Sequence, residues 1–136
     1  LKYLETRAGS GRYHYAMSVR AIRGATQATA NTAQAITSAT QELLREILAV
    51  NSLTPEDVIS VLFTASPDLT ATFPAAAARD LGFESTPLIC SVEIDVPGAL
   101  ERTIRVMAHV HTELSKSDIA HIYLHAAKSL RRDIAQ

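Results

Sequence analysis

One segment of the chain, residues 31–51, has the pattern of a long helix, and this helix limits how the rest can fold. Asn31, followed three residues later by Gln34, predicts an N-terminal cap with a capping-box partner. Asn51-Ser52 predicts the end of the helix. The apolar residues recur at helical spacing and form one stripe, at positions 33, 36, 43, 44, 47 and 48. We therefore expect an amphipathic helix that lies on a sheet.

The rest of the chain reads mainly as strands. Runs of β-branched or alternating residues predict five of them, at 19–23, 58–63, 88–94, 104–110 and 121–124. Shorter helical segments are predicted after Thr54-Pro55, at 75–81 between Pro74 and Gly82, at 99–103 and at the capping signature 115–118. Together these elements predict an α+β (mixed α/β) domain with a five-stranded sheet, one long helix and short helices.

The predicted sheet is too wide for its one long helix. A helix covers about 10 Å of sheet width, roughly two strands at their usual spacing. Apolar sheet surface is left over, and a partner subunit is its natural cover. We therefore expect an oligomer.

Composition excludes several classes of protein. The 136 residues carry 13 Lys and Arg against 14 Asp and Glu, so there is no basic surplus for a nucleic-acid partner. A single cysteine excludes an internal disulfide framework, and no apolar run approaches the length of a membrane span. We expect a cytoplasmic domain over residues 17–136. Residues 1–16 lack any period, and we interpret them as a cloning remnant or a disordered extension.

The sequence offers little for a metal site or for nucleophilic catalysis. His121 and His125 would share a helix face, but their segment reads as strand, where they would lie about 13 Å apart. His109 and His111 share a strand face without a third ligand nearby, so solvated or interface histidines are the better interpretation. Cys90 lies in an apolar strand, where a free cysteine is usually a small hydrophobe. We expect no metal and no cofactor.

Three charges lie inside or at the end of apolar strands: Arg23, Glu93 and Arg105. Such residues are rarely buried unless they are paired. Either these strand faces are wet and Glu93 pairs with Arg105 structurally, or the charges build a pocket that binds an anion.

Seven blocks, in order, make the sequence similar to a known family. They are 20–26 (RAIRGAT), Pro67-Asp68-Leu69, Phe73-Pro74-Ala75, 90–96 (CSVEIDV), 104–107 (IRVM), 121–124 (HIYL) and Leu130-Arg131. Together, over about residues 18–133, they resemble the monofunctional chorismate mutases of the trimeric, pseudo-α/β-barrel class. The resemblance implies a homotrimer with active sites between subunits and the isomerisation of chorismate to prephenate, on the route to phenylalanine and tyrosine. That intramolecular Claisen rearrangement uses no cofactor.

The resemblance also implies a role for each matching residue. Arg105 would be the cation beside the breaking ether oxygen, and Glu93 would accept from the ring hydroxyl, with Cys90 near the same hydroxyl. Arg23 would clamp a carboxylate, with a further hydrogen bond from Tyr123. The remaining residues would form an apolar wall from the neighbouring subunit (Phe73, Ala75) and the entrance (Arg79, Leu130, Arg131).

Two difficulties accompany this resemblance. In a regular strand Cys90 and Glu93 point to opposite faces, so either the strand bends or they face different sites of the trimer. Ala76 and Arg132 replace a lysine and a proline that are frequent in the family.

Two other functions are alternatives to the mutase. One is a catalytically silent trimeric protein that binds small carboxylates, and the other is another enzyme on a similar trimeric barrel, such as an enamine deaminase.

Overall fold

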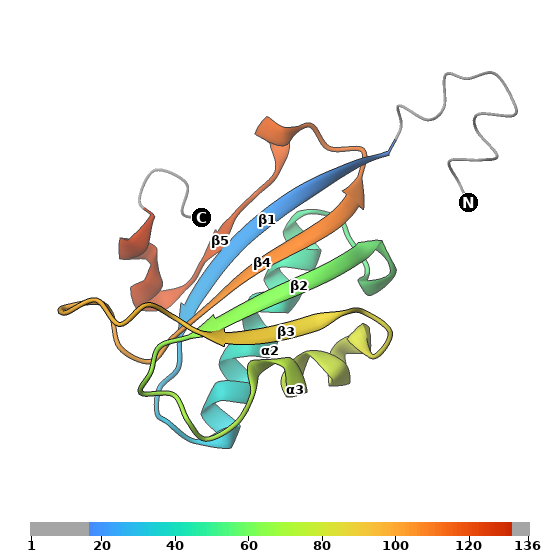
Figure 1. The fold of residues 1–136 in the computed structure, drawn as a ribbon. Helices are drawn as coiled ribbons and strands as arrows, with labels where there is room; N and C mark the ends of the chain where they lie inside the picture. The colour runs from blue at the N-terminus through green and yellow to red at the C-terminus, as the bar shows by residue number, and fades with distance from the viewer. Residues whose placement is uncertain (1–16, 132–136) are drawn as a thin grey trace, which may run out of the picture.

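A computed structural model describes residues 17–131, and Figure 1 shows its arrangement. Five strands form one sheet in the order β3-β2-β4-β1-β5. β4 is antiparallel to β1 and β2, whereas β2 pairs with β3 and β1 with β5 in parallel. The predicted mixed sheet with one long helix is confirmed. The proposed extension at 1–16 and Arg132 lie outside the described residues.

The elements follow one another along the chain with short connections. The strands are β1 (Ser18–Gln27), β2 (Val58–Ala65), β3 (Leu88–Val92), β4 (Thr103–Thr112) and β5 (Ile122–Tyr123). The helices are α2 (Ala33–Val50) and α3 (Pro74–Ala78). Short helical turns are η2 (Pro55–Asp57), η3 (Arg79–Phe83), η4 (Lys116–Asp118) and η5 (His125–Leu130).

The main core lies between the sheet and α2. The predicted stripe supplies Leu43, Leu44 and Ile47, which pack against alternate residues of the central strands. The strand residues of this core include Ile22, Val61, Phe63, Val106, Ala108 and Val110. Figure 1 shows α2 crossing behind the sheet, so the opposite face, which we call the open face, has no long helix on it.

Apolar side chains remain exposed on the open face. The sequence predicts this, because one long helix is too narrow to cover a five-stranded sheet. Val19 is 51% exposed, Leu62 46%, Ile89 61% and Met107 38%. A monomer would leave this surface in water. Within the described residues, no helix is both long enough and apolar enough to cross a membrane.

Two local predictions are wrong. Thr32, not Asn31, caps α2 by accepting from the N–H of Ala35, because the Asn31 side chain instead binds the 70–71 backbone. Residues 99–102 are not helical, and residue 103 already begins β4. Arg102 has a φ of 49°, and its N–H donates to Asp68, so a long-range contact sets this turn.

Strand boundaries also differ from the predicted ones. β1 continues past Gly24 to Gln27, because its whole length pairs with β4. β3 ends at Val92, two residues earlier than predicted, and β5 has only two residues. Glu93 therefore lies just beyond the end of β3.

Candidate active site

Strand register brings four of the predicted site residues together on the open face. Arg105 lies opposite Ala25 on one side and Thr64 on the other, and Ala25 also pairs with Tyr123. Arg23 is two residues before Ala25 and therefore shares its face. These side chains line a cavity of about 290 Å³. Its walls are Arg23, Leu62, Thr64, Glu93, Arg105, Met107 and Tyr123, with Gly24 and Val106.

Glu93 and Arg105 form an ion pair within this cavity. Oε2 of Glu93 lies 3.3 Å from Nε of Arg105, and the side chains are 32% and 41% exposed. A pair so exposed contributes only about 0–1 kcal/mol to stability, so holding the fold together is a weak reason for it. Nε of Arg105 is buried but makes no hydrogen bond of good geometry to any described residue. The exposed part of the guanidinium lines the cavity and can donate to a ligand there.

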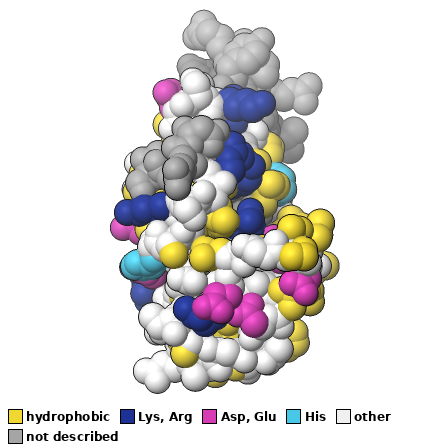
Figure 2. Space-filling view, turned by 90° about the vertical axis from the view of Figure 1, so that its left-hand side faces the viewer, with side chains coloured by type: hydrophobic (Ala, Val, Ile, Leu, Met, Phe, Trp, Pro, Cys, Tyr) yellow, Lys and Arg dark blue, Asp and Glu magenta, His cyan; other side chains and the backbone are white. Residues whose placement is uncertain are grey.

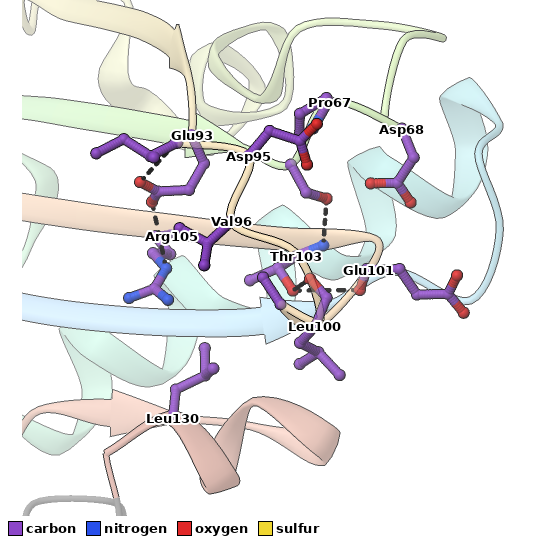
Figure 3. Close-up of a pocket in the computed structure, with 13 residues that line it drawn as sticks. Pro67, Asp68, Glu93, Asp95, Val96, Leu100, Glu101, Thr103, Arg105 and Leu130 are labelled. Atoms are coloured by element: carbon purple, nitrogen blue, oxygen red, sulfur yellow. Dashed lines mark hydrogen bonds and ion pairs between the residues drawn. The ribbon is translucent and has the colours of Figure 1, made fainter.

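A larger hollow of about 720 Å³ adjoins the ion pair (Figure 3). Figure 3 shows Glu93 and Arg105 directed toward one another on one side of it, while Leu130 approaches from η5. Loop residues complete the lining, including Pro67, Asp68, Asp95, Val96 and Glu101. The site therefore opens from the sheet face toward the loops at one end of the strands.

Asp68, at the edge of the larger hollow, is held as a carboxylate. Burial acts to raise its pKa. Hydrogen bonds from Ser66 and from the Arg102 and Asp68 backbone N–H groups, with the positive charge of Arg102, outweigh burial and lower the pKa. Asp68 thereby fixes the turn that leads into β4.

Cys90 does not line either cavity. It pairs with Phe63 and packs against the core on the α2 side of the sheet. Glu93 follows the end of β3, where its N–H donates to Ala65 while its carboxylate lies on the open face. Within one chain, the two side chains thus face opposite sides of the sheet.

The residues assigned to a neighbouring subunit lie away from this cavity. Phe73 precedes α3 and is 72% exposed, whereas Ala75 is buried in the core of its own chain. Arg79 is exposed at the start of η3. Arg131 is the last described residue, and its charge acts on His121.

Two residues near the site were not among the predicted ones. Thr64 Oγ1 donates to Oε2 of Glu93 over 2.8 Å. The backbone N–H of Arg23 donates to Nδ1 of His121 over 3.0 Å. Period-two alternation along 58–63 could have placed Thr64 on the same face as Leu62. His121, by contrast, could be found only from the pairing of β5 with β1.

The histidines do not assemble a metal site. No group of three His, Cys, Asp or Glu residues within 17–131 has the arrangement to hold a metal ion. His125 instead pairs with Glu42 at 2.8 Å on the α2 side.

Comparisons with known proteins agree with the geometry. The model of the chorismate mutase type I family matches residues 19–134. The chorismate mutase AroH of Bacillus subtilis (strain 168) is 42% identical over 120 residues, which are 88% of this chain and 94% of the relative. The AroH chorismate mutase of Thermus thermophilus is 43% identical over 117 residues, 85% of this chain and 96% of the relative. The solved chorismate mutase from Clostridium thermocellum has a TM-score of 0.79 and 54% identity, and the match covers 80% of this chain and 97% of that one.

Proposed function

The chain belongs to the chorismate mutase type I family, and from this premise we propose how its open face carries out the reaction. The enzyme is an isomerase that converts chorismate to prephenate, which leads to phenylalanine and tyrosine. The rearrangement is intramolecular. The protein must hold a flexible dicarboxylate in a compact conformer and stabilise the charge that develops on the breaking ether oxygen.

Arg105 supplies the positive charge at the ether oxygen. The proposal is supported by its position at the centre of the sheet, between β1 and β2, where the strand fixes its backbone. A fixed cation stabilises the transition state more than the ground state, because negative charge on that oxygen grows as the bond breaks. The single observation that carries this role most directly is that the Arg105 side chain lines the cavity and is 41% exposed, so its guanidinium can reach a bound substrate.

Glu93 binds the ring hydroxyl of the substrate. Its two oxygens accept from Thr64 Oγ1 and from the N–H of Ile94, so the carboxylate is oriented before a ligand arrives. We propose that the Arg105–Glu93 ion pair loosens when substrate binds, because each partner then turns to the substrate. Arg23 and Tyr123, which line the same cavity, bind a carboxylate.

The site is completed by a second subunit in a homotrimer. Support comes from the exposed apolar residues of the open face and from Phe73, whose ring is 72% exposed in one chain. Phe73 and Ala75 of the neighbour form an apolar wall, Ala75 through its backbone, and Cys90 lies near the ring hydroxyl. Arg79, Leu130 and Arg131 line the entrance. We place this biosynthetic enzyme in the cytoplasm.

The test is chorismate turnover by Arg105 variants. Loss of chorismate absorbance is followed for purified protein, and prephenate is confirmed by acid conversion to phenylpyruvate. Arg105→Ala should lower kcat/KM by about a thousandfold. Light scattering should show that this variant still forms the trimer. Arg105→Lys should recover only part of the lost kcat/KM, because lysine supplies the charge but not the several N–H donors of a planar guanidinium.

Arg45→Ala is the matched control. Arg45 is exposed on α2, on the other side of the sheet, and its loss should leave turnover unchanged. An Arg105→Ala trimer with wild-type kcat/KM would remove Arg105 from the mechanism.

A further inference from the structure

His121 is joined to the proposed carboxylate clamp through the backbone. It immediately precedes β5, and its Nδ1 accepts a 3.0 Å hydrogen bond from the N–H of Arg23. An imidazole nitrogen accepts only when it carries no proton, so this contact requires Nδ1 to be unprotonated and places the ring proton on Nε2.

This hydrogen bond replaces a missing strand contact. β5 pairs with β1 only at Gly24 and Ala25, so its ladder stops one residue short of Arg23. The His121 side chain serves the N–H of Arg23 in place of a backbone carbonyl. The orientation of the β1 backbone at Arg23 therefore depends on the imidazole.

The surroundings of His121 are cationic. It lies in a hollow of about 440 Å³ beside β1, and the charged residues that line this hollow are Arg20, Arg23 and Lys116. Its other lining residues are Val19, Ala21, Met107 and Ile119, and none is acidic. Figure 2, which faces the β5 side, shows Lys and Arg side chains gathered above the centre of this view. Burial, followed by the charges of Arg23 and Arg131, lowers the pKa of His121.

We propose that His121 is a positioning residue that orients Arg23 toward a substrate carboxylate, and that it does so only while its imidazole is neutral. The inference rests on the proposed role of Arg23. Protonation of Nδ1 would set a donor against the N–H of Arg23 and add a positive charge beside the guanidinium. Arg23 would then move, and chorismate would bind more weakly.

The expected signature is a pH-dependent KM. His121→Asn is the informative variant, because Asn retains an acceptor oxygen near the place of Nδ1 but does not titrate. KM and kcat are measured from about pH 8 to about pH 5, the range in which histidine changes charge. The wild-type KM should rise toward the acidic end with little change in kcat, whereas that of His121→Asn should stay within about twofold of its neutral value.

His121→Ala removes the acceptor altogether. Its KM should be roughly fivefold above the wild-type value at neutral pH, which corresponds to the loss of one hydrogen bond, and should stay there at all pH values. His125→Asn is the matched control, since His125 pairs with Glu42 on the other side of the sheet, and it should keep the wild-type profile. Circular dichroism and light scattering establish that each variant is folded and assembled.

An Arg23→Ala variant separates this inference from the proposed function. It keeps the backbone N–H and loses only the guanidinium. If Arg23→Ala leaves KM unchanged, the carboxylate clamp itself is wrong. If Arg23→Ala raises KM but the His121→Asn and wild-type profiles coincide, the clamp stands and the positioning role of His121 is overturned. If His121→Ala raises KM further in the Arg23→Ala background by the same factor, His121 acts without Arg23, which also overturns it.

Discussion

The Thr64 hydroxyl donates a 2.8 Å hydrogen bond to Oε2 of Glu93, the same oxygen that lies 3.3 Å from Nε of Arg105. Oε1 of Glu93 accepts from the N–H of Ile94 over 3.1 Å. Both oxygens are therefore oriented by the protein before substrate arrives. In the proposed mechanism these contacts matter for the rate, because preorganised groups lose less conformational freedom on binding.

Thr64→Val tests this support. Valine has nearly the same shape but no hydroxyl, so Glu93 loses one of its donors. We expect kcat/KM for chorismate to fall about fivefold, the value of one hydrogen bond, with little change in Tm. Thr37→Val, on α2 at the other side of the sheet, serves as the control. Unchanged kcat/KM in Thr64→Val would mean that Glu93 is oriented without it.

A charge placed on the open face tests the homotrimer. Leu62 is 46% exposed and lines the cavity beside Arg105. Leu62→Glu should dissociate the trimer, because a carboxylate cannot be buried without a partner, and activity should fall to near the uncatalysed rate with it. Light scattering and turnover at matched concentrations measure both effects.

Val50→Glu is the matched control for that experiment. Val50 is 49% exposed at the end of α2 rather than on the open face, so the variant should remain a trimer with wild-type turnover. A Leu62→Glu trimer, or an active Leu62→Glu monomer, would contradict the proposed assembly.

Local patterns predicted those parts of the molecule that depend on local physics. The stripe Leu43, Leu44 and Ile47 is buried on the sheet because helical spacing and apolar character together determine its face. Five strands were predicted from β-branched runs and alternation. The turn at 99–102 was mispredicted, since Arg102 adopts its left-handed conformation against Asp68, 34 positions away in the chain.

The site likewise has residues that a local pattern predicts and contacts that depend on how the strands pair. Arg105 was identified as a charge in an apolar strand, and the resemblance gave it a role. Its neighbours depend on register: Thr64 faces it only because β2 and β4 pair as they do. Glu93 lies on the open face by the same alternation that places Cys90 on the other side, but its contact with Arg105 depends on β2 lying between β3 and β4.

Gly24→Ala probes how closely β1 approaches β5 and α2 at Gly24. A Cβ at Gly24 would lie 2.9 Å from the carbonyl oxygen of Ile122 and 3.0–3.1 Å from the Ile47 and Leu43 methyl groups. The methyl groups can move, but the carbonyl belongs to β5. We expect a loss of about 1–3 kcal/mol in the free energy of unfolding, measured by urea denaturation. Adding Leu43→Ala should not restore it. Full recovery in the double variant would place the strain on the helix side instead.

Asn51 ties the end of α2 to the segment before β5. Its buried side chain donates to the carbonyls of Ile47 and Ala120 and accepts from the N–H of Ala120, over 2.8–2.9 Å. Asn51→Ala should lower the free energy of unfolding by about 2–3 kcal/mol, because the N–H of Ala120 is left without its acceptor. Asn51→Asp should not recover this loss, since a carboxylate cannot donate to the two carbonyls. Recovery by Asn51→Asp in guanidinium denaturation would show that only the acceptor contact matters.

The pH dependence of stability gives a separate test of His121. Its pKa in the folded protein is lowered by burial and then by Arg23 and Arg131, from an ordinary value of 6.5. The unfolded chain therefore takes up a proton first as pH falls. The stability that the neutral ring contributes is present above about pH 6.5 and is lost as pH falls through the folded pKa.

Urea denaturation of wild type and His121→Asn at one protein concentration, from about pH 8 to about pH 5, measures this contribution. The difference between the two free energies of unfolding should be constant above about pH 6.5. It should shrink below that, with a slope under the limit of about 1.4 kcal/mol per pH unit for one proton. Partial exposure of the ring keeps the slope well below that limit. Parallel wild-type and His121→Asn curves through this range would mean that the imidazole titrates alike in both states, against the pKa direction that its surroundings dictate.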